Sequence, residues 1–513
     1  MQKEIFENKD KYKEVKVTDN KYKKNVKKLG LIFILVMFVI IYIISISKLN
    51  LQNDTLFDIK LGEQYLNHGV VTEDTFSIHS GLKYVSHHFI VNIITYCIYN
   101  FSGFFGLYIL EIFLTCLLAI CFYVANRQFL KSKVLSYLFV FLQLFLMTPF
   151  ISIRAQMYSY ILFLLEIIFI ERFLKTSKKS YIILLCLLPI LIVNFHAGML
   201  MLYFVIIGTY FCNLLKISFF KVCIEDKQRL KNTKYLFIPF IFGLFAGLMN
   251  PFGIDLLVYG LKTLSNSFIN STISEFRPVN IKSFIGEIMY IYSFLIITSF
   301  CFTKKKIKLH HALFFVGTMF MGLFSSRHFG VMVICTITCL SYLEDILYEI
   351  REKMYKGLVP KGKIAINVTG CVMFGICFLY LSVSGFLRLN REYLPAGNYP
   401  HNAVKYIKEN IGQDKRIFND YNYGTLLMFN NIPPFIDSRC DLYTQEYNKG
   451  CNVAMDYKTA STCSGDYSAV LKKYNIDYVF MGKEKPLVNA MANNDKFEQI
   501  YSDNECCIYK IIK

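Results

Sequence analysis

Long apolar runs alternate with short polar connections over most of the chain. A run of about 20 apolar residues matches the hydrocarbon width of a bilayer when it forms an α-helix. The pattern therefore predicts a polytopic α-helical membrane protein with about eleven transmembrane helices. The predicted spans are 30–49, 103–124, 134–151, 155–171, 180–195, 197–214, 235–250, 284–302, 309–325, 328–343 and 364–387.

The first connection that carries helical patterning of its own is 50–102. Apolar residues recur at helical spacing through Leu56–Leu66, and Asp54 or Thr55 stands where an N-cap residue is expected. A second amphipathic segment, Phe89–Phe101, has an apolar stripe but is too short to cross a bilayer. We therefore predict two helices that rest on the membrane surface.

Composition excludes the common soluble classes. The 513 residues are 54% hydrophobic and only 18% charged, whereas globular proteins carry about 25% charged residues. The apolar excess falls in uninterrupted runs, which also excludes fibrous and disordered classes. The 16 cysteines include no CxxC pair, and most are interpreted as small buried hydrophobic residues.

The charge distribution predicts how the chain is oriented. The formal net charge is +19, and the first 29 residues hold ten lysines. Lys and Arg are retained on the cytoplasmic side of a membrane, and every second loop is basic. We predict a cytoplasmic Lys-rich tail over 1–29, a transmembrane module over 30–388 and an extracytoplasmic domain over 389–513, all in the plasma membrane. The charge is thus explained by orientation and by anionic lipid, without nucleic acid as a partner.

The last 125 residues, 389–513, change to a polar pattern that predicts a small α/β domain. Its expected elements are a helix over Asn402–Ile411, buried strands over Arg416–Asn419 and Asp477–Met481, and an edge strand over Glu505–Ile512. Asp437, Arg439 and Asp441 form a charged cluster in this domain. The cluster has two interpretations, a structural salt bridge and a site that recognises an acceptor or product.

Candidate chemistry gathers on the predicted outer side. Short outer turns hold Arg154, His196 and Arg327 at the membrane surface, where ionisable residues are costly and often functional. We predict that the outer turns converge on one polar cavity. The candidate site residues are Asp54, Asp58, Asp74, His87, His88, Arg154, Gln156, Asn194, His196, Glu275, Arg327 and His328.

Several motifs carry a family resemblance. The stretch NDTLFDIKLGEQYLNHGVVTEDTFS resembles the first outer loop of GT-C glycosyltransferases, in which an Asp opens a helix that ends at a Gly. This superfamily includes protein mannosyltransferases, aminoarabinose transferases and oligosaccharyltransferases. The motifs SIRAQMYSY, VNFHAGM, MNPFG, ISEFRPV and FNDYNYGTLLMF…PFIDSRCDLY resemble a bacterial branch with an extracytoplasmic carboxyl-terminal domain.

The sequence also departs from better-known members of that superfamily. Many have an acidic pair where Asp54 and Thr55 stand, so the second carboxylate is missing or is displaced to Asp58 or to Glu73 and Asp74. The chain contains no Trp and therefore no WWD motif, which argues against an oligosaccharyltransferase itself.

The resemblance implies transfer of a sugar from a polyprenyl-phosphate donor to an envelope glycan, lipid or protein on the outer face. Such a reaction needs a carboxylate that accepts the acceptor proton, and Asp54 is assigned that role, with Asp58 and Asp74 as further catalytic candidates. Arg or protonated His side chains would stabilise the departing phosphate. The remaining nine candidates are assigned to substrate and phosphate binding.

Each candidate also has a structural interpretation. Asp54 can be only a helix N-cap, Asp58 only a solvated charge, Asp74 a turn residue, and Arg154 a side chain that reaches lipid headgroups. Aspartates and histidines can also hold a divalent metal ion, although their spacing matches no metal signature.

Other functional classes remain open at this stage. A polymerase or ligase of lipid-linked glycans usually has its long outer loop late in the chain, whereas here it comes first. A transporter or flippase needs polar or broken helices near the bilayer midplane, and the predicted spans have few. A scaffold that has lost its catalytic residues fits the missing acidic pair.

Overall fold

The computed structural model describes residues 36–47, 51–215, 218, 220–223, 227–265, 276–388, 392–395, 399–412 and 414–512. Two compact units make up the chain. The first consists of Met1–Ser47 and Leu358–Leu389, and the second of Lys48–Gly357 and Asn390–Lys513. In the first unit, the helix Val36–Ile46 packs on α16 (Pro360–Arg388), where the rings of Phe38 and Phe378 lie 4.6 Å apart.

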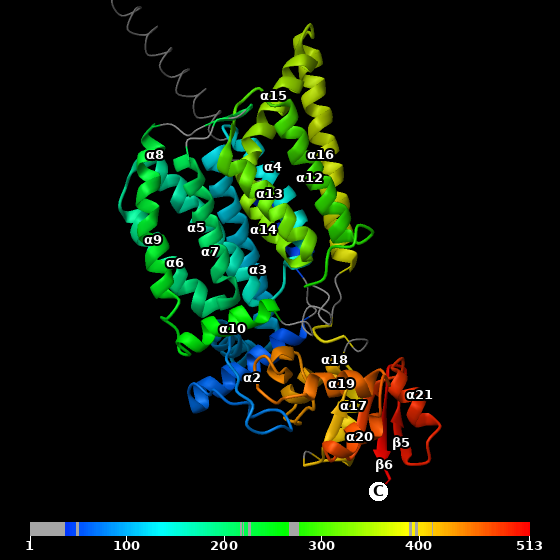
Figure 1. The fold of residues 1–513 in the computed structure, drawn as a ribbon. Helices are drawn as coiled ribbons and strands as arrows, with labels where there is room; N and C mark the ends of the chain where they lie inside the picture. Colours follow the sequence, from blue (N-terminus) through cyan, green and yellow to red (C-terminus); the bar gives the residue numbers. More distant parts are fainter. Residues whose placement is uncertain are drawn as a thin grey trace, which may run out of the picture. The chain divides into compact units, whose positions relative to one another are not determined.

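The second unit contains a helical bundle and the carboxyl-terminal domain, which we call the cap (residues 392–512). Figure 1 shows α2 and α10 lying at one end of the bundle, next to the cap. The bundle helices are α2 (Asn53–His68), α3 (Phe89–Phe129), α4 (Lys133–Met147), α5 (Ala155–Thr176), α6 (Ser180–His196), α7 (Leu200–Phe211), α8 (Lys227–Thr233), α9 (Phe237–Ala246), α10 (Ile254–Ser265), α12 (Phe284–Phe302), α13 (Leu309–Phe324), α14 (Phe329–Cys335) and α15 (Leu340–Tyr355). A short parallel pair, β1 (Val222–Cys223) and β2 (Ile307–Lys308), joins two of its connections.

Several long apolar helices show that the chain is a multi-pass membrane protein. Among the described residues, six helices are long and apolar enough to cross a membrane. They are Phe89–Phe129, Lys133–Phe150, Ser180–Leu215, Phe284–Phe302, Ser326–Tyr355 and Pro360–Ser384. These six include seven of the eleven predicted spans, because Ser180–Leu215 breaks at His196 into α6 and α7.

The other four predicted spans are also helical, but they are shorter or more charged. Of 30–49 the structure describes residues 36–47, which contain the helix Val36–Ile46. The span 235–250 contains α9, and 309–325 corresponds to α13. The span predicted at 155–171 corresponds to α5, whose second half carries Glu166, Glu171 and Arg172. The number eleven, the orientation and the domain boundaries therefore stay predictions.

A break in α3 separates the predicted surface helix from the span that follows it. Ser102 and Gly103 have non-helical backbone angles, and Gly103 has φ +63°. Glycine adopts this conformation without a steric penalty, so the chain bends where Phe89–Phe101 ends. The predicted division at residue 103 is confirmed.

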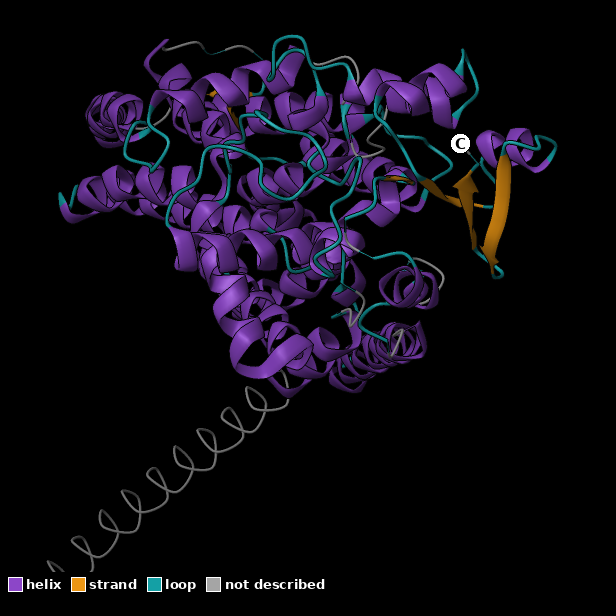
Figure 2. Ribbon diagram, turned by 90° about the horizontal axis from the view of Figure 1, so that it is seen from below, coloured by secondary structure: helices purple, strands orange, loops and turns teal. Residues whose placement is uncertain are grey.

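The cap is a mixed sheet with helices packed beside it, and Figure 2 shows its strands near the carboxyl terminus. The strands are β3 (Ile417–Asn419), β4 (Tyr478–Gly482), β5 (Phe497–Ser502) and β6 (Cys506–Ile511), in the order β3-β4-β6-β5. The helices are α17 (His401–Asn410), α18 (Tyr421–Phe429), α19 (Val453–Ser461), α20 (Tyr467–Lys473) and α21 (Pro486–Ala492).

One strand prediction in the cap is wrong. Residues 505–512 were expected to form an edge strand, but β6 lies between β4 and β5 and pairs antiparallel with both. Its first four residues are buried, whereas β5 is half-exposed along its length. The edge position is taken by β5, whose polar residues gave no strand pattern in the sequence. The predicted helix at 402–411 and the strands at 416–419 and 477–481 are confirmed as α17, β3 and β4.

Candidate functional site

Helix α2 is fixed against the bundle by one apolar face and one close contact. Leu56, Ile59 and Leu61 are buried, and the Thr55 hydroxyl donates to the Ile153 carbonyl at 2.9 Å. A Cβ at Gly62 would lie 2.2 Å from the Asn92 carbonyl oxygen, so only glycine permits this approach of α2 to α3. Helix α2 therefore has a fixed position relative to the turn before α5.

The first turn of α2 presents Asp54 to Arg154. The carboxylate Oδ2 lies 2.6 Å from the guanidinium Nη2, and the two side chains are 30% and 21% exposed. The N-cap of α2 is Gln52, so the interpretation of Asp54 as a helix cap is wrong. Its carboxylate instead forms an accessible ion pair between α2 and the turn that precedes α5. The helix ends, as expected, at a glycine, Gly69 with φ +78°.

One turn further along α2, Asp58 lies in a buried polar group. It is 1% exposed and lies 2.9 Å from Nδ1 of His88, which excludes the interpretation as a solvated charge. The Asn92 amide, with its nitrogen turned toward Asp58, donates to that carboxylate at 2.8 Å and accepts from Ser86. Burial alone would lower the pKa of His88, but the Asp58 carboxylate, through its charge and its hydrogen bond, raises that pKa above its usual value.

His87 and His196 complete the cluster behind the ion pair. The His196 ring lies 6.4 Å from the ring of His87 and 6.5 Å from that of His88. Ser159 on α5 lies 2.9 Å from Nδ1 of His196, and the backbone amide of Ala197 donates to the His87 carbonyl at 2.8 Å. The loop between α2 and α3 is thus joined to the turn between α6 and α7.

His87 has unused hydrogen-bonding capacity. Its Nδ1 is buried and has no hydrogen-bond partner in the described part of the chain, although most buried polar atoms in proteins have one. Burial lowers the pKa of His87 well below its usual value, and the charges of His88 and Arg327 lower it further. A neutral imidazole in this position can hydrogen-bond a ligand.

Arg327 belongs to the same neighbourhood, since its charge acts on both His87 and His196. Its guanidinium also lies over the ring of Phe276, 4.8 Å from the ring centroid. Arg154 pairs with Asp54, and its charge, like that of Arg327, acts on His196. The four residues therefore lie in one neighbourhood, and their roles and a shared cavity stay predictions.

The remaining candidates have varied surroundings. Gln156 donates to the Tyr160 hydroxyl on its own helix, and Asn194 donates to the carbonyls of Ile190 and Met249. The side-chain amides of these two residues are therefore hydrogen-bonded within the protein, to a tyrosine hydroxyl or to backbone carbonyls. His328 lies next to Arg327 in a short 3₁₀ turn. Glu275 lies outside the described residues.

Asp74 is bound to the cap. Its Oδ1 lies 2.6 Å from Nη1 of Arg439, which also contacts Asp437 at 2.6 Å, and all three side chains are at most 1% exposed. Burial raises the pKa of Asp74, but Arg439 and the hydrogen bonds around it outweigh burial and hold the pKa below its usual value. This geometry gives Asp74 a structural partner, and it connects the first outer loop to the cap.

Asp441 of the cap lies near this cluster and was not among the candidates from the sequence. It lies close enough to Asp54 and His88 for both charges to act on its pKa, and burial raises that pKa to about 6. The sequence placed it in a cluster with Arg439, but the contact of Arg439 is with Asp437. Only the fold shows that the cap supplies a carboxyl group to this site.

The raised pKa of Asp441 predicts a pH-dependent stability. Between about pH 4 and pH 6 the unfolded chain loses this proton while the folded protein keeps it, so stability falls as the pH rises and stays lower above pH 6. One pKa unit corresponds to about 1.4 kcal/mol, so Asp441→Asn should raise the free energy of unfolding by about 1 to 3 kcal/mol at pH 8. Denaturation at pH 4 and pH 8 measures this, and an equal effect at both values would contradict it.

The described residues do not fit a metal centre. Asp54 is paired with Arg154 and Asp58 with His88, and a cation already opposes each carboxylate. No group of three or more His, Cys, Asp or Glu side chains that could hold a metal ion occurs among the residues the structure describes. We therefore derive no step through a metal.

Similar architecture occurs in solved glycosyltransferases. The apo oligosaccharyltransferase from Archaeoglobus fulgidus matches with a TM-score of 0.59 and 11% identity over 88% of this chain and 69% of its own. The oligosaccharyltransferase AglB from Archaeoglobus fulgidus, in complex with an inhibitory peptide and a dolichol-phosphate, matches with a TM-score of 0.57 and 12% identity over 89% of this chain and 70% of its own. The chain has a GT-C-like fold.

A second GT-C enzyme has a similar fold over part of its length. The arabinofuranosyltransferase AftD from mycobacteria matches with a TM-score of 0.50 and 9% identity over 93% of this chain but only 41% of that enzyme. No protein-family model and no curated protein matches the sequence. Identities this low show a shared fold, and the activity has to be argued from the site.

Proposed function

We propose that the protein is a membrane glycosyltransferase that moves a sugar from a polyprenyl-phosphate donor to an envelope glycan, lipid or protein. The observation that supports this proposal most directly is the accessible ion pair of Asp54 with Arg154. It lies next to the buried cluster of His87, His88 and His196. A carboxylate and a guanidinium that lie side by side match a reaction that removes a proton and releases a phosphate. The GT-C-like fold supports this class of reaction.

In the proposed mechanism, an acceptor hydroxyl attacks the anomeric carbon of the bound sugar. A carbon–oxygen bond to the acceptor forms, and the bond from the anomeric carbon to the phosphate oxygen breaks. Asp54 accepts the hydroxyl proton, because it is the accessible carboxylate of the pair on α2. The transition state has oxocarbenium character, as in glycoside hydrolysis.

The leaving polyprenyl phosphate develops negative charge as the bond breaks, and Arg154 stabilises it. Its planar guanidinium can bind a carboxylate and a phosphate oxygen at the same time. Arg327 adds positive charge to the same neighbourhood, and His87 and His196 line it. The buried Asp58–His88 pair is a positioning element that fixes α2 relative to α3.

The predicted orientation places this reaction on the outer face of the plasma membrane. There the donor lies in the outer leaflet of the bilayer and the acceptor belongs to the cell envelope. AglB provides a parallel, since its structure holds a dolichol-phosphate together with a peptide. This chain has no Trp and no acidic pair at Asp54, so the peptide bound by AglB does not predict the acceptor here.

Arg154→Gln is expected to lower transfer at least about a hundredfold, because the loss of one preorganised charge at a leaving group has this effect. Arg154→Lys should retain more activity than Arg154→Gln, because lysine keeps the positive charge although it lacks the planar guanidinium that binds two oxygens at once. Purified protein in nanodiscs is supplied with a panel of labelled polyprenyl-phosphate sugars and an envelope extract, and released polyprenyl phosphate is measured. Arg351→Gln, an exposed arginine on α15, is the matched control.

The same experiment separates the competing functions. If Arg154→Gln released polyprenyl phosphate as fast as the wild type, Arg154 would have no role at the leaving group. Movement of the lipid-linked sugar across sealed vesicles without any new glycosidic bond would indicate a flippase and contradict the transferase.

A further inference from the structure

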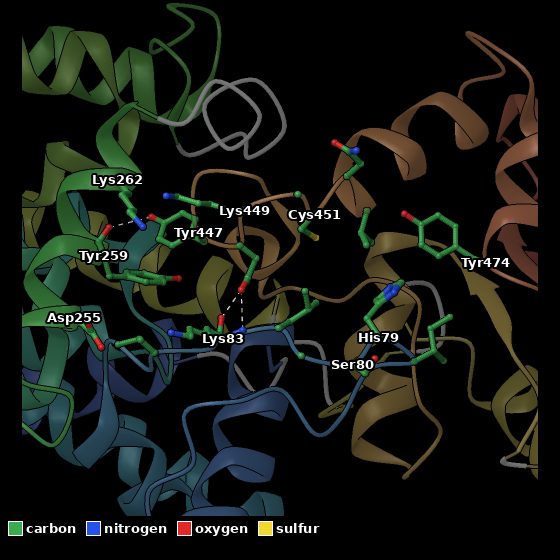
Figure 3. Close-up of a pocket in the computed structure, with 18 of the residues that line it drawn as sticks. His79, Ser80, Lys83, Asp255, Tyr259, Lys262, Tyr447, Lys449, Cys451 and Tyr474 are labelled. Carbon is green, nitrogen blue, oxygen red and sulfur yellow. Dashed lines mark hydrogen bonds between the residues drawn. The ribbon is translucent and has the colours of Figure 1, made fainter.

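A polar cavity lies near the candidate site, and Figure 3 shows it. Its volume is about 940 Å³, and three separate parts of the chain line it. These are residues 78–85 of the first outer loop, one face of α10, and the cap around residues 447–453 and 473–474. We call this cavity the cap groove.

The cap groove is strongly basic. Five cationic side chains line it against one carboxylate, Asp255. They are Lys83, Lys262, Arg416, Lys449 and Lys473. Lys473 is paired with Asp456, with 2.6 Å between Nζ and Oδ2, so it contributes little to the positive excess. Lys83 and Lys449 are exposed, and Figure 3 shows them on facing segments of the groove.

Tyrosine rings stand among these cations. Tyr259 and Tyr447 lie with ring centroids 4.3 Å apart, and the Tyr447 hydroxyl donates to the Tyr259 carbonyl at 3.1 Å. Tyr474 lies at the other end of the groove in Figure 3. Aromatic rings with a polar tip offer both a flat apolar surface and a hydrogen-bonding group, which suits the faces and hydroxyls of sugar rings.

The groove is connected to the candidate site through Tyr259. One neighbour of the Tyr259 ring is Tyr447 of the groove, and another is His87, which stacks on it with a centroid distance of 5.6 Å and an angle of 22°. His87 in turn adjoins His88 and His196. A chain bound in the groove therefore ends next to the proposed catalytic cluster.

From these observations we infer that the cap groove binds the acceptor, and that the acceptor is an anionic glycan bearing carboxylate or phosphate groups. Lysines and an arginine on the wall bind the anionic groups, and the tyrosines pack against the sugar rings. This inference rests on the proposed function, because it places the attacking hydroxyl at the Tyr259 end of the groove. There Asp54 takes its proton as the new glycosidic bond forms.

The test is a binding measurement on the full-length protein in nanodiscs of zwitterionic phosphatidylcholine. The probes are an oligogalacturonate, a phosphorylated oligomannose, neutral maltoheptaose and a decamer of glutamate. We expect one or both anionic oligosaccharides to bind at least about tenfold more tightly than maltoheptaose, with an affinity that falls as salt rises. Lys83→Gln/Lys449→Gln should weaken this binding at least about tenfold.

The matched control is Lys496→Gln/Lys510→Gln, which removes the same charge from exposed lysines at β5 and β6. It should leave binding unchanged. Equal weakening by both double variants, or tighter binding of the glutamate decamer than of either anionic sugar, would overturn the inference. Release of polyprenyl phosphate from the labelled donors in the presence of the envelope extract tests the proposed function separately. If no polyprenyl phosphate is released while anionic glycans still bind, the proposed transferase function is wrong, and the glycan-binding role of the cap groove stands.

Discussion

Asp54→Asn is expected to lower sugar transfer by about a thousandfold while the fold stays intact. A positioned general base contributes about a hundredfold to ten-thousandfold, and the amide cannot accept the acceptor proton. The ion pair with Arg154 is partly exposed, and such pairs contribute at most about 1 kcal/mol to stability. The measurement is the initial rate of labelled sugar transfer, together with the thermal unfolding midpoint.

Asp495→Asn is the control for this variant, because Asp495 is an exposed aspartate of the cap away from the cluster. It should transfer sugar at the wild-type rate. If Asp54→Asn kept more than about a tenth of the wild-type rate, Asp54 would not be the base. The buried Asp58 would be the next candidate, although its contact with His88 makes it less accessible.

Arg439→Met is expected to lower the free energy of unfolding by about 3 to 5 kcal/mol. The substitution leaves Asp74 and Asp437 buried together without their cation, and removing one partner of a buried ion pair has a cost of about this size. The Arg439 guanidinium also lies over the rings of Phe76 and Tyr84. We expect the cap to separate from the first outer loop, which limited proteolysis and denaturation measure.

A neutral triple variant tests the reason for this loss. Asp74→Asn/Asp437→Asn/Arg439→Met removes all three charges, and it should recover at least half of the lost stability, because hydrogen-bonded neutral groups are less costly to bury than unpaired charges. A triple variant as unstable as Arg439→Met would show that packing on the aromatic rings, and not the ion pairs, holds the loop to the cap.

Local patterns were sufficient for the parts of the fold that depend on nearby residues. The apolar spacing after Asp54 predicted α2, and the end of the amphipathic segment at Phe101 predicted the break at Ser102 and Gly103. The short turns that carry Arg154, His196 and Arg327 indicated that these side chains would lie in one neighbourhood, and the charges of both arginines act on His196. The reason is geometric, since a turn of a few residues between two spans cannot carry a side chain far from the membrane surface.

Long-range pairings could not be predicted in this way. Asp74 and Arg439 are 365 residues apart in the chain, and no local signal connects them. The same holds for Asp441, which the cap brings close to Asp54, and for Tyr259, which joins the groove to His87. The half-exposed β5 was missed because its residues alternate too little for a strand pattern.

The central claim is that the phosphate of a lipid-linked sugar binds among the outer turns next to Asp54. It is tested most directly by an electron cryomicroscopy structure of the Asp54→Asn variant in nanodiscs with a polyprenyl-phosphate sugar that the wild type consumes. We predict phosphate density within about 3 Å of the Arg154 guanidinium, with the sugar between it and residue 54. Phosphate density elsewhere in the bundle, with the space beside Arg154 filled only by solvent, would contradict the account.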